Sequence, residues 1–313
     1  MNAAEIRLAY DRIRPHVRQT PVLELPVGSL GDFPVSMKLE YLQHTGSFKP
    51  RGAFNTLLSH DIPAAGIAAA SGGNHGAAAA YAARALVHAA DIFVPEISDP
   101  VKIERIRSYG ANVHVGGGDY AEALIRCDAH CAKTGAFSIH AYDAPATIAG
   151  QGTTGLEWQN QSGELDTVLV AVGGGGLIAG IAAWFAGKKT RVIGVEPTGC
   201  PTLHAALEAG APIEITPKSI AADSLGARSA GGLVYDIAKD HIDRVVLIED
   251  QAIKDAQKDL WQNYRIATEP GGAAAYGALL SDAYKPEPGE RLGILVCGAN
   301  VQLPALDQTV TKA

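Results

Sequence analysis

The first feature that could do chemistry is a single lysine in the segment HTGSFKPRGAFNTLL, residues 44–58. Lys49 follows Phe48 and directly precedes Pro50, a residue that favours the first turn of a helix. An amine at a helix start lies beside the positive end of the helix dipole, which favours the neutral form of the amine. Lys49 is therefore either a surface charge or an amine held in place as a nucleophile.

The second feature is the glycine loop in VLVAVGGGGLIAGIAAWF, which reads as a strand, a turn and a helix from about Leu177. Gly173, Gly174, Gly175 and Gly176 can turn bare backbone N–H groups toward an anion, and the following helix adds its positive dipole end. A phosphate is the expected ligand. No Lys-Ser/Thr pair follows the glycines, so the loop is not that of a P-loop NTPase.

Two other interpretations of this loop stay open on this stretch alone. Gly174, Gly176 and Ala179 fit the pattern G-x-G-x-x-A, and Glu196 lies 20 residues after Gly176, as in a dinucleotide-binding fingerprint. A tight structural turn without any ligand is the other interpretation.

The third feature is SGGNHG, residues 71–76, which follows an Ala-rich strand and opens an Ala-rich helix. Ser71 and Asn74 could simply cap that helix. Three glycines around Asn74 and His75 exceed what a cap requires, so the loop could also present N–H groups and short polar side chains to a carboxylate. Two anion sites and one framed amine suit a phosphorylated cofactor, a carboxylate substrate and an amine nucleophile.

The elements that would position these residues alternate between strands and helices. Strands are expected at Ala111–Val115 and in DTVLVAV, TRVIGVEP, DRVVLIED and RLGILVCGAN, and helices at Gly176–Ala186, Glu249–Tyr264 and Pro270–Leu280. This alternation predicts an α/β fold with mostly parallel sheets. No sequence repeat or low-complexity linker separates two halves, so two domains would be interleaved by chain crossings.

Composition excludes several classes of function. The chain has 313 residues, a net charge of -7 and no basic run, which argues against nucleic acid and anionic membrane as partners. No apolar run of membrane-spanning length lacks a charge or glycine, and the N-terminal segment MNAAEIRLAYDRIR has no signal-peptide pattern. We therefore expect a cytoplasmic protein.

The 4 cysteines do not form a disulfide framework. Cys127 and Cys131 lie one helical turn apart with His130 between them, which could be half of a metal site. No second Cys/His pair appears in the sequence, so ordinary helix packing is the favoured interpretation.

The motifs together resemble one family. SFKPRGA from Ser47, SGGNHG from Ser71, the glycines 173–176 and CGAN from Cys297 occur in the order typical of the threonine/serine dehydratase and serine racemase group. That group consists of fold-type II enzymes that use pyridoxal 5'-phosphate (PLP). The resemblance covers nearly the whole chain, from RIRPHVRQTPV through IAGQGTTGLEW and ATEPGGAAAYGALL to VCGAN. It displaces the dinucleotide interpretation.

The resemblance implies a role for each motif. Lys49 would form the Schiff base with PLP, Asn74 would hydrogen-bond its 3'-oxygen, and Cys297 would face the pyridine nitrogen. The implied cofactor-binding residues are Phe48, Lys49, Asn74, Gly173, Gly174, Gly175, Gly176, Leu177 and Cys297, and the implied substrate-binding residues are Ser71, Gly72, Asn74 and His75.

The resemblance also implies a reaction. A thiol at Cys297 cannot force protonation of the ring nitrogen as a carboxylate would, so the electron sink is weak and β-elimination is favoured over transamination. Lys49 would remove the α-proton, and the leaving hydroxyl would be protonated by a donor such as the PLP phosphate. A 2-oxo acid and ammonia would result.

L-Threonine or L-serine is the expected substrate. The alternatives are another 3-hydroxy amino acid of the 3-hydroxyaspartate or phenylserine type, serine racemisation, and a PLP-binding or sensing protein without catalysis. Tyr142 and Asp143 are expected near the cleft and could tune the choice of substrate.

Three positions depart from the family pattern. Gly72 stands where serine racemases carry a second serine, which makes two-base racemisation doubtful. Glu196, Cys200 and Thr202 stand at the racemase cation site, where Thr202 replaces an aspartate, so no metal is predicted. The chain ends soon after Asn300, so no C-terminal regulatory domain is expected.

The resemblance implies two domains and a homodimer. A large PLP-binding domain would comprise residues 1–50 and 145–313, and a small mobile domain, residues 51–144, would carry the Asn74 loop. The cofactor would lie in the cleft between them, and the small domain could close on the substrate.

Overall fold

Two β-sheets organise the protein, and a computed structural model describes them within residues 1–302. The larger sheet has the spatial order β1-β2-β10-β7-β8-β9. All neighbouring strands in it are parallel except the β1–β2 pair. Its strands are β1 (Val22–Leu25), β2 (Val35–Lys38), β7 (Thr167–Ala171), β8 (Arg191–Pro197), β9 (Arg244–Ile248) and β10 (Leu292–Leu295).

The smaller sheet is entirely parallel and has the order β5-β4-β3-β6. Its strands are β3 (Ile67–Ala70), β4 (Ala90–Val94), β5 (Asn112–Val115) and β6 (Phe137–Ser138). Parallel neighbours require crossover connections, which here are the helices α3 (Asn74–Ala85), α4 (Pro100–Ser108) and α5 (Tyr120–Thr134).

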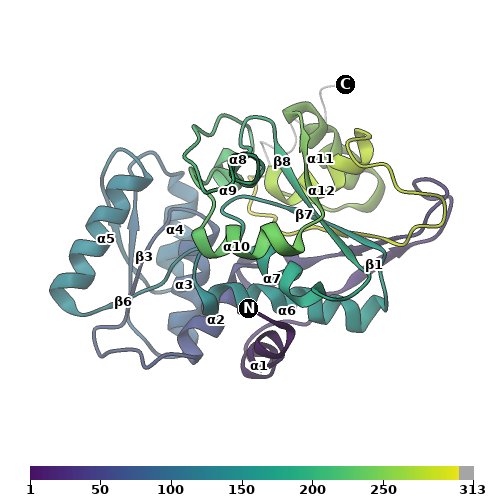
Figure 1. Cartoon of the computed structure of the whole chain (residues 1–313). Helices are drawn as coiled ribbons and strands as arrows, with labels where there is room; N and C mark the ends of the chain where they lie inside the picture. The colour runs from purple at the N-terminus through teal and green to yellow at the C-terminus, as the bar shows by residue number, and fades with distance from the viewer. Residues whose placement is uncertain (303–313) are drawn as a thin grey trace.

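Helices cover both faces of the larger sheet. Figure 1 shows α6 (Pro145–Ser162) and α7 (Gly176–Phe185) on one side and α11 (Asp250–Tyr264) and α12 (Pro270–Leu280) on the other. The remaining helices are α1 (Ala3–Ile13), α2 (Lys49–Leu58), α8 (Thr202–Ala209), α9 (Ala222–Leu225) and α10 (Gly232–His241), with 3-10 turns η1 (Glu40–Leu42) and η2 (His44–Gly46). Helix α7 is buried along its whole length.

The predicted α/β class with mostly parallel sheets is confirmed, as are the expected strands and the helices after Gly176, Glu249 and Glu269. The alternative interpretation, in which Ser71 and Asn74 only cap α3, is wrong. Gly73 is the N-cap residue, no side chain among residues 1–302 caps this helix, and Ser71 Oγ accepts a hydrogen bond from the Gly73 N–H group at 3.2 Å. The Asn74 side chain is instead engaged by distant parts of the chain.

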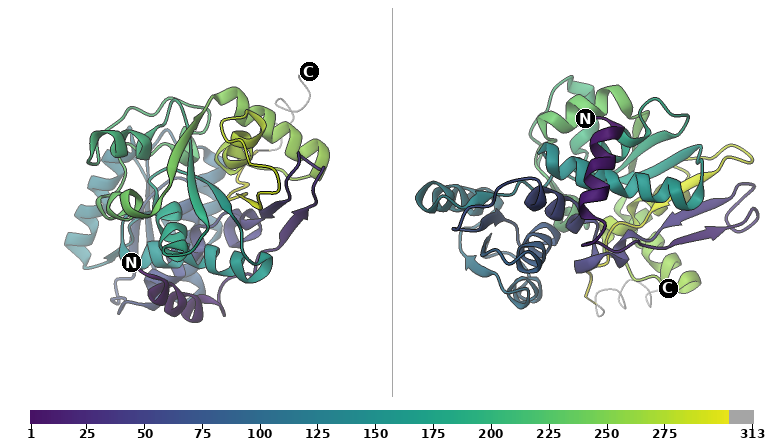
Figure 2. Two further views of the ribbon diagram at one scale, coloured as in Figure 1. Left: turned by 45° about the vertical axis from the view of Figure 1, so that its right-hand side comes forward. Right: turned by 90° about the horizontal axis from the view of Figure 1, so that it is seen from below.

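The strands of each sheet fall into one of the two predicted ranges. Those of the larger sheet lie within residues 1–50 and 145–313, and those of the smaller sheet lie within 51–144. Figure 2 shows the two sheets in separate units on its right-hand view, and along the sequence the chain passes between them twice, after β2 and after β6. Helix α2 packs against α6 of the first range and α3 of the second. The division into domains and the mobility of the smaller one stay predictions.

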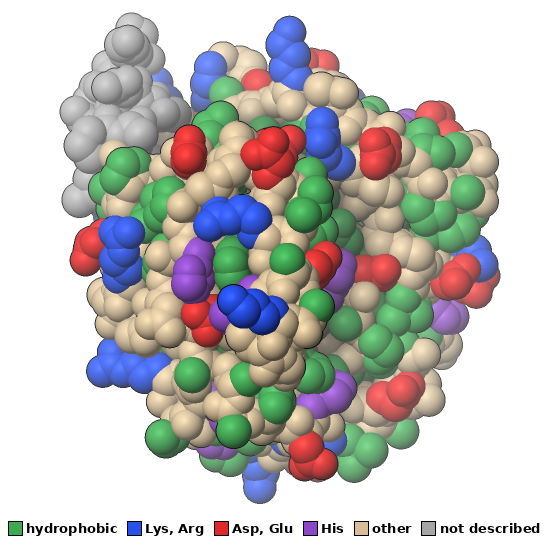
Figure 3. All heavy atoms as spheres, turned by 90° about the vertical axis from the view of Figure 1, so that its left-hand side faces the viewer, with side chains coloured by type: hydrophobic (Ala, Val, Ile, Leu, Met, Phe, Trp, Pro, Cys, Tyr) green, Lys and Arg blue, Asp and Glu red, His purple; other side chains and the backbone are tan. Residues whose placement is uncertain are grey.

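The surface over the smaller sheet carries both signs of charge, with Lys and Arg side chains interspersed among Asp and Glu (Figure 3). Cys127 is buried against Ala68, Ala70 and Phe93, and its thiol is free, as is that of Cys131. Packing of the helix against the smaller sheet accounts for Cys127 and Cys131 lying one turn apart. Across residues 1–302, no helix is both long enough and apolar enough to span a membrane.

Candidate active site

The start of α2 is placed by a short pairing with the segment after β10. Ser47 forms an antiparallel bridge with Gly298, and the Phe48 N–H group donates to the Cys297 carbonyl oxygen at 3.1 Å. This pairing brings Lys49 beside Cys297, although the two residues are far apart in the sequence. Lys49 Nζ donates to the Ala141 carbonyl oxygen at 2.8 Å and lies 5.1 Å from the centre of the Phe48 ring.

The amine of Lys49 is tuned for chemistry near neutral pH. Burial lowers its pKa to about 8, although the neighbouring Cys297 and Glu269 act in the opposite direction. A substantial fraction of the amine is therefore neutral at slightly alkaline pH and able to act as a nucleophile or base.

The glycine loop presents backbone N–H groups to the same cavity. Gly175 has φ +89°, a conformation that favours glycine, and α7 begins directly after it. Within the described part of the chain no side chain caps α7, although its first turn is buried. A buried helix start with free N–H groups requires a partner, and a phosphate supplies one. The residues present therefore fit a phosphorylated cofactor.

One cavity brings most of the predicted cofactor residues together. It is lined by Phe48, Lys49, Tyr142, Ala171, Gly173, Gly174, Gly175, Gly176, Leu177, Ser224, Leu225 and Cys297. The predicted residues Ser71, Gly72, Asn74 and His75 are not part of this lining. Ser224 and Leu225, which belong to α9, were not predicted because no motif in the sequence marks them.

The thiol of Cys297 is neutral. It is buried, and its Sγ lies 3.6 Å from the Gly271 carbonyl oxygen as a hydrogen-bond donor. Burial, together with the nearby Glu269, raises the pKa of Cys297 to about 12. The thiol therefore stays protonated at neutral pH. The sequence argument assumed this when it treated Cys297 as an uncharged group that cannot force protonation of a ring nitrogen.

Glu269 is a further residue near the site that the sequence analysis missed. Asn74 Nδ2 donates to Glu269 Oε1 at 2.7 Å, and Asn74 Oδ1 accepts from the side chain of Asn300. Burial raises the pKa of Glu269 to about 7. The motif ATEPGG contains this carboxylate directly before a helix, and a charge next to an apolar helix was the available signal.

The side chain of His75 is already engaged by the protein. It is buried, and its Nε2 lies 3.0 Å from the Ile139 carbonyl oxygen, so Nε2 carries the proton. Burial lowers the pKa of His75 to about 3, so the ring is neutral and Nδ1 can only accept. A substrate carboxylate could therefore be bound by the backbone N–H of His75, not by its ring.

Gly72 leaves no room for a side chain in this arrangement. A Cβ atom added at Gly72 would lie 2.2 Å from Ser98 Oγ and 3.0 Å from Val94 Cγ1. The φ angle of Gly72 is outside the left-handed region, so the restriction is steric. Ser98 fills the space that a second serine in this loop would need.

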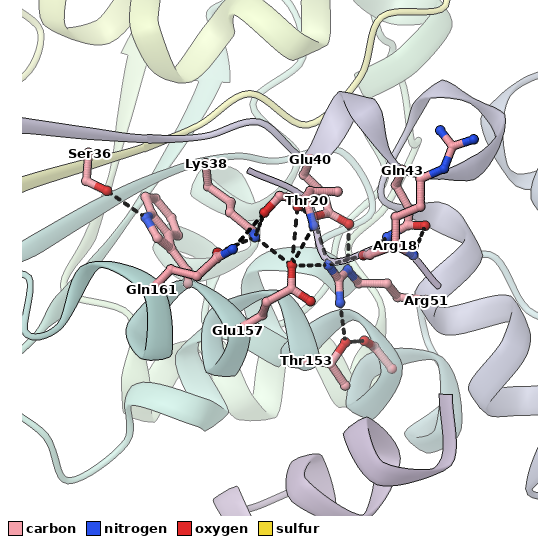
Figure 4. Close-up of polar contacts among 12 residues, drawn as sticks. Arg18, Thr20, Ser36, Lys38, Glu40, Gln43, Arg51, Thr153, Glu157 and Gln161 are labelled. Carbon is pink, nitrogen blue, oxygen red and sulfur yellow. Dashed lines mark hydrogen bonds and ion pairs between the residues drawn. The ribbon is translucent and has the colours of Figure 1, made fainter. Parts of the chain in front are cut away.

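A buried ion cluster fixes the elements around α2 (Figure 4). Arg51, two residues after Lys49, pairs with Glu40 at 2.5 Å and with Glu157 at 2.8 Å, and Lys38 pairs with Glu157 at 2.6 Å. All four side chains are at most 2% exposed. Two cations and two carboxylates balance each other, so β2, η1, α2 and α6 are held together by matched buried charges.

Three further residues that the sequence analysis named, Glu196, Asp143 and Tyr142, form hydrogen bonds to backbone groups of the protein. The carboxylate of Glu196 is buried and accepts from the N–H groups of Leu203 and His204 at the start of α8. Asp143 accepts from the Gly232 and Val234 N–H groups at the start of α10. Tyr142 lines the cavity and donates through its hydroxyl to the Ser229 carbonyl oxygen.

These features define an α/β site that holds a phosphate-bearing cofactor beside a reactive amine. The sequence matches the family described as "Pyridoxal-phosphate dependent enzyme" over residues 13–298, and the chain belongs to that family. Its cofactor is PLP, and it is a fold-type II enzyme of this kind.

The relatives carry several names. The chain is 36% identical to phenylserine dehydratase of Ralstonia pickettii, in an alignment that covers 92% of this chain and 90% of the relative. It is 34% identical to L-threonine ammonia-lyase of Geobacter sulfurreducens, over 98% of this chain and 77% of the relative. The solved structure of maize serine racemase aligns with a TM-score of 0.93 and 34% identity, over 99% of this chain and 97% of that chain. The family therefore includes lyases and racemases at similar distances from this chain.

Proposed function

We propose that this protein is an ammonia-lyase that eliminates water from a 3-hydroxy amino acid. The enamine product, as its imine tautomer, then takes up water and releases ammonia, so that the net products are a 2-oxo acid and ammonia. The observation that carries the proposal is the meeting of the low-pKa amine of Lys49, the uncapped glycine loop and the neutral thiol of Cys297 in one cavity. PLP, when bound, supplies the electron sink for the α-carbon of the amino acid.

The residues of this chain would then divide the work. Lys49 binds PLP and, once freed, accepts the α-proton at Nζ. Gly173–Gly176 and Leu177 hold the phosphate, Phe48 packs near the ring, and Asn74 donates to the 3'-oxygen. The loop of Ser71, Gly72, Asn74 and His75 receives the substrate carboxylate through N–H groups and the Ser71 hydroxyl. Cys297, uncharged, leaves the sink weak, which favours loss of the β-hydroxyl over reactions that need a long-lived carbanion.

L-Threonine or L-serine is the proposed substrate, because relatives named L-threonine ammonia-lyase align over nearly the whole of this chain. A phenylserine-type substrate is the second candidate, because the relative named phenylserine dehydratase is as similar as any of these. Serine racemisation is disfavoured by Gly72, since Ser98 fills the space that a second base would occupy.

The decisive experiment is a steady-state assay of 2-oxo acid and ammonia with L-threonine, L-serine, phenylserine and 3-hydroxyaspartate. We expect kcat/KM to be highest for L-threonine or L-serine. A preference for phenylserine of tenfold or more would make the second candidate the function. PLP binding without turnover of any of these amino acids would refute the lyase proposal and favour a PLP-binding protein.

The arrangement of domains and subunits is part of the same proposal. A small domain of residues 51–144 would close on the substrate over the cavity, and two copies of the chain would form a homodimer in the cytoplasm. Size-exclusion chromatography with light scattering tests the dimer.

A further inference from the structure

The side chains around Asn74 form a chain of hydrogen bonds that links the part of the molecule containing the smaller sheet to the part containing the larger sheet. Arg105 of α4 donates through Nη1 to Asn300 Oδ1. Asn300 Nδ2 donates to Asn74 Oδ1 and to the Thr45 carbonyl oxygen, the latter at 2.9 Å. Asn74 Nδ2 donates to Glu269 Oε1 at 2.7 Å.

The two ends of this chain fix its direction. A guanidinium only donates hydrogen bonds, and a carboxylate only accepts them. Arg105 therefore requires the oxygen of the Asn300 amide, which turns the NH₂ group of Asn300 toward Asn74. Glu269 requires the NH₂ group of Asn74, which turns the Asn74 oxygen toward Asn300. Neither amide can flip without placing two donors or two acceptors against each other.

The fixed direction of these hydrogen bonds leaves one N–H bond of the Asn74 amide without a partner among Arg105, Asn300 and Glu269. Its oxygen is occupied by Asn300 and one of its two N–H bonds is occupied by Glu269. The second N–H bond is left as a donor. A flipped amide would instead offer a second oxygen lone pair, which repels a phenolic oxygen.

We propose that Arg105 and Glu269 are positioning residues that hold the Asn74 amide with an N–H group, not its oxygen, toward the PLP 3'-oxygen. The inference rests on the proposed role of Asn74. It adds two residues that need not touch the cofactor and to which the sequence analysis assigned no role.

Four charged or titratable groups interact electrostatically with Glu269, whose pKa is raised to about 7. Lys102 of α4 and Asp223 of α9 act on the pKa of Glu269, and Glu269 acts on the pKa of Lys49 and of Cys297. Lys102 favours ionisation of Glu269, as does the Asn74 hydrogen bond, whereas burial and Asp223 oppose it. Protonation in acid would give Glu269 a donor beside its remaining acceptor oxygen, so the carboxyl group would no longer fix which group of the Asn74 amide faces it.

The test is a double-mutant cycle on the PLP dissociation constant, measured without substrate. The proteins are wild type, Glu269→Gln, Asn74→Ala and the double variant, each stripped of PLP and titrated by visible absorption. We expect Glu269→Gln to weaken PLP binding about tenfold in the wild-type background, because it replaces a hydrogen bond to a charged acceptor by one to a neutral amide, which can also present its NH₂ group to Asn74. In the Asn74→Ala background the same change should have less than a twofold effect.

Arg105→Gln tests the other end and does not disturb the buried carboxylate. It should also weaken PLP binding and shift the absorption maximum of bound PLP in the same direction as Glu269→Gln. Arg107→Gln on the same helix and Glu214→Gln, which alter exposed side chains, are the matched controls. Far-UV circular dichroism reports whether each variant is folded.

Two results would overturn the proposal. One is an equal effect of Glu269→Gln in both backgrounds, which would mean that Glu269 acts without Asn74. The other is an Arg105→Gln protein with the PLP affinity and spectrum of wild type. Because no substrate is used, these outcomes are independent of the substrate assay, and failure of the lyase proposal there would leave this inference standing.

Discussion

The buried ion cluster allows a quantitative prediction for Glu157→Gln. Glu157 Oε1 accepts from Lys38 Nζ at 2.6 Å, from Arg51 Nη2 at 2.8 Å and from the Thr20 N–H group at 3.0 Å. The substitution preserves the size of the side chain but leaves two buried cations facing one carboxylate, that of Glu40. Breaking a buried pair by removing one partner costs about 3–5 kcal/mol.

We therefore expect a loss of about 3 kcal/mol in the free energy of unfolding, at the lower end because the glutamine oxygen still accepts hydrogen bonds. For a chain of this size, a urea slope of about 3 kcal/mol per M converts this loss to a fall of about 1 M in the urea midpoint. The measurement is urea denaturation of the PLP-free protein at pH 7.5, followed by far-UV circular dichroism. Glu214→Gln, at an exposed position, should leave the midpoint unchanged.

The pH dependence of this effect has a defined sign. Burial alone would raise the pKa of Glu157, but Arg51 and Lys38 outweigh burial and the pKa is lowered. A carboxylate with a lowered pKa contributes stability that is present above its ordinary pKa and is lost as the pH falls through the folded-state pKa. The difference between wild type and Glu157→Gln should thus be full at pH 7 and shrink below about pH 4.5. A midpoint shift below about 0.3 M at pH 7.5, or one that grows in acid, would refute the reasoning.

Four further predictions concern the site. Borohydride reduction of the holoenzyme should fix the cofactor mass on the peptide that contains Lys49, and a mass shift on another lysine would contradict the assigned role. Because burial lowers the pKa of Lys49 to about 8, the folded state loses stability as the pH falls from about 10.5 to 8. Lys49→Met should therefore stabilise the PLP-free protein more at pH 6 than at pH 11, and thermal unfolding at the two pH values measures the difference. Cys297→Asp should slow elimination relative to side reactions while PLP still binds; an unchanged elimination rate would mean that Cys297 does not face the ring nitrogen. Wild type should convert L-serine to pyruvate with little D-serine. Gly72→Ser should raise D-serine formation only together with Ser98→Gly, because a Cβ at Gly72 would lie 2.2 Å from Ser98 Oγ. Chiral chromatography distinguishes these outcomes, and brisk D-serine formation by wild type would contradict the steric argument.

The parts of the site that sequence could predict are those with local signals. Lys49 before a proline and the four glycines after a strand each follow from a few consecutive residues, and Cys297 follows from the resemblance of the segment CGAN to the family. The structure brings all of them into one cavity. The alternation of strands and helices likewise predicted the parallel sheets, because each element carries its own pattern.

The parts that sequence could not predict depend on contacts between distant residues. Glu269 lies 195 residues from Asn74, and Arg105 lies 195 residues from Asn300, so no local pattern marks either pair. The same reason explains why Asn74 does not cap α3, an alternative that the sequence left open: its amide donates to the distant Glu269 instead. Ser98 is similar, because its effect on Gly72 becomes visible only when their backbones are placed side by side.

The charges around Lys49 explain why a thiol suits this site. Burial lowers the pKa of Lys49, whereas negative charge nearby raises it, and Glu269 already contributes such a charge. A carboxylate in place of Cys297 would add a second, so the amine would hold its proton more firmly and act less readily as a base near neutral pH. It would also raise the pKa of Glu269 and disfavour the ionised form that accepts from Asn74. A neutral thiol avoids both effects, so with the roles proposed above for Cys297 and Asn74, the residue that would weaken the electron sink would also preserve the free amine and the orientation of Asn74.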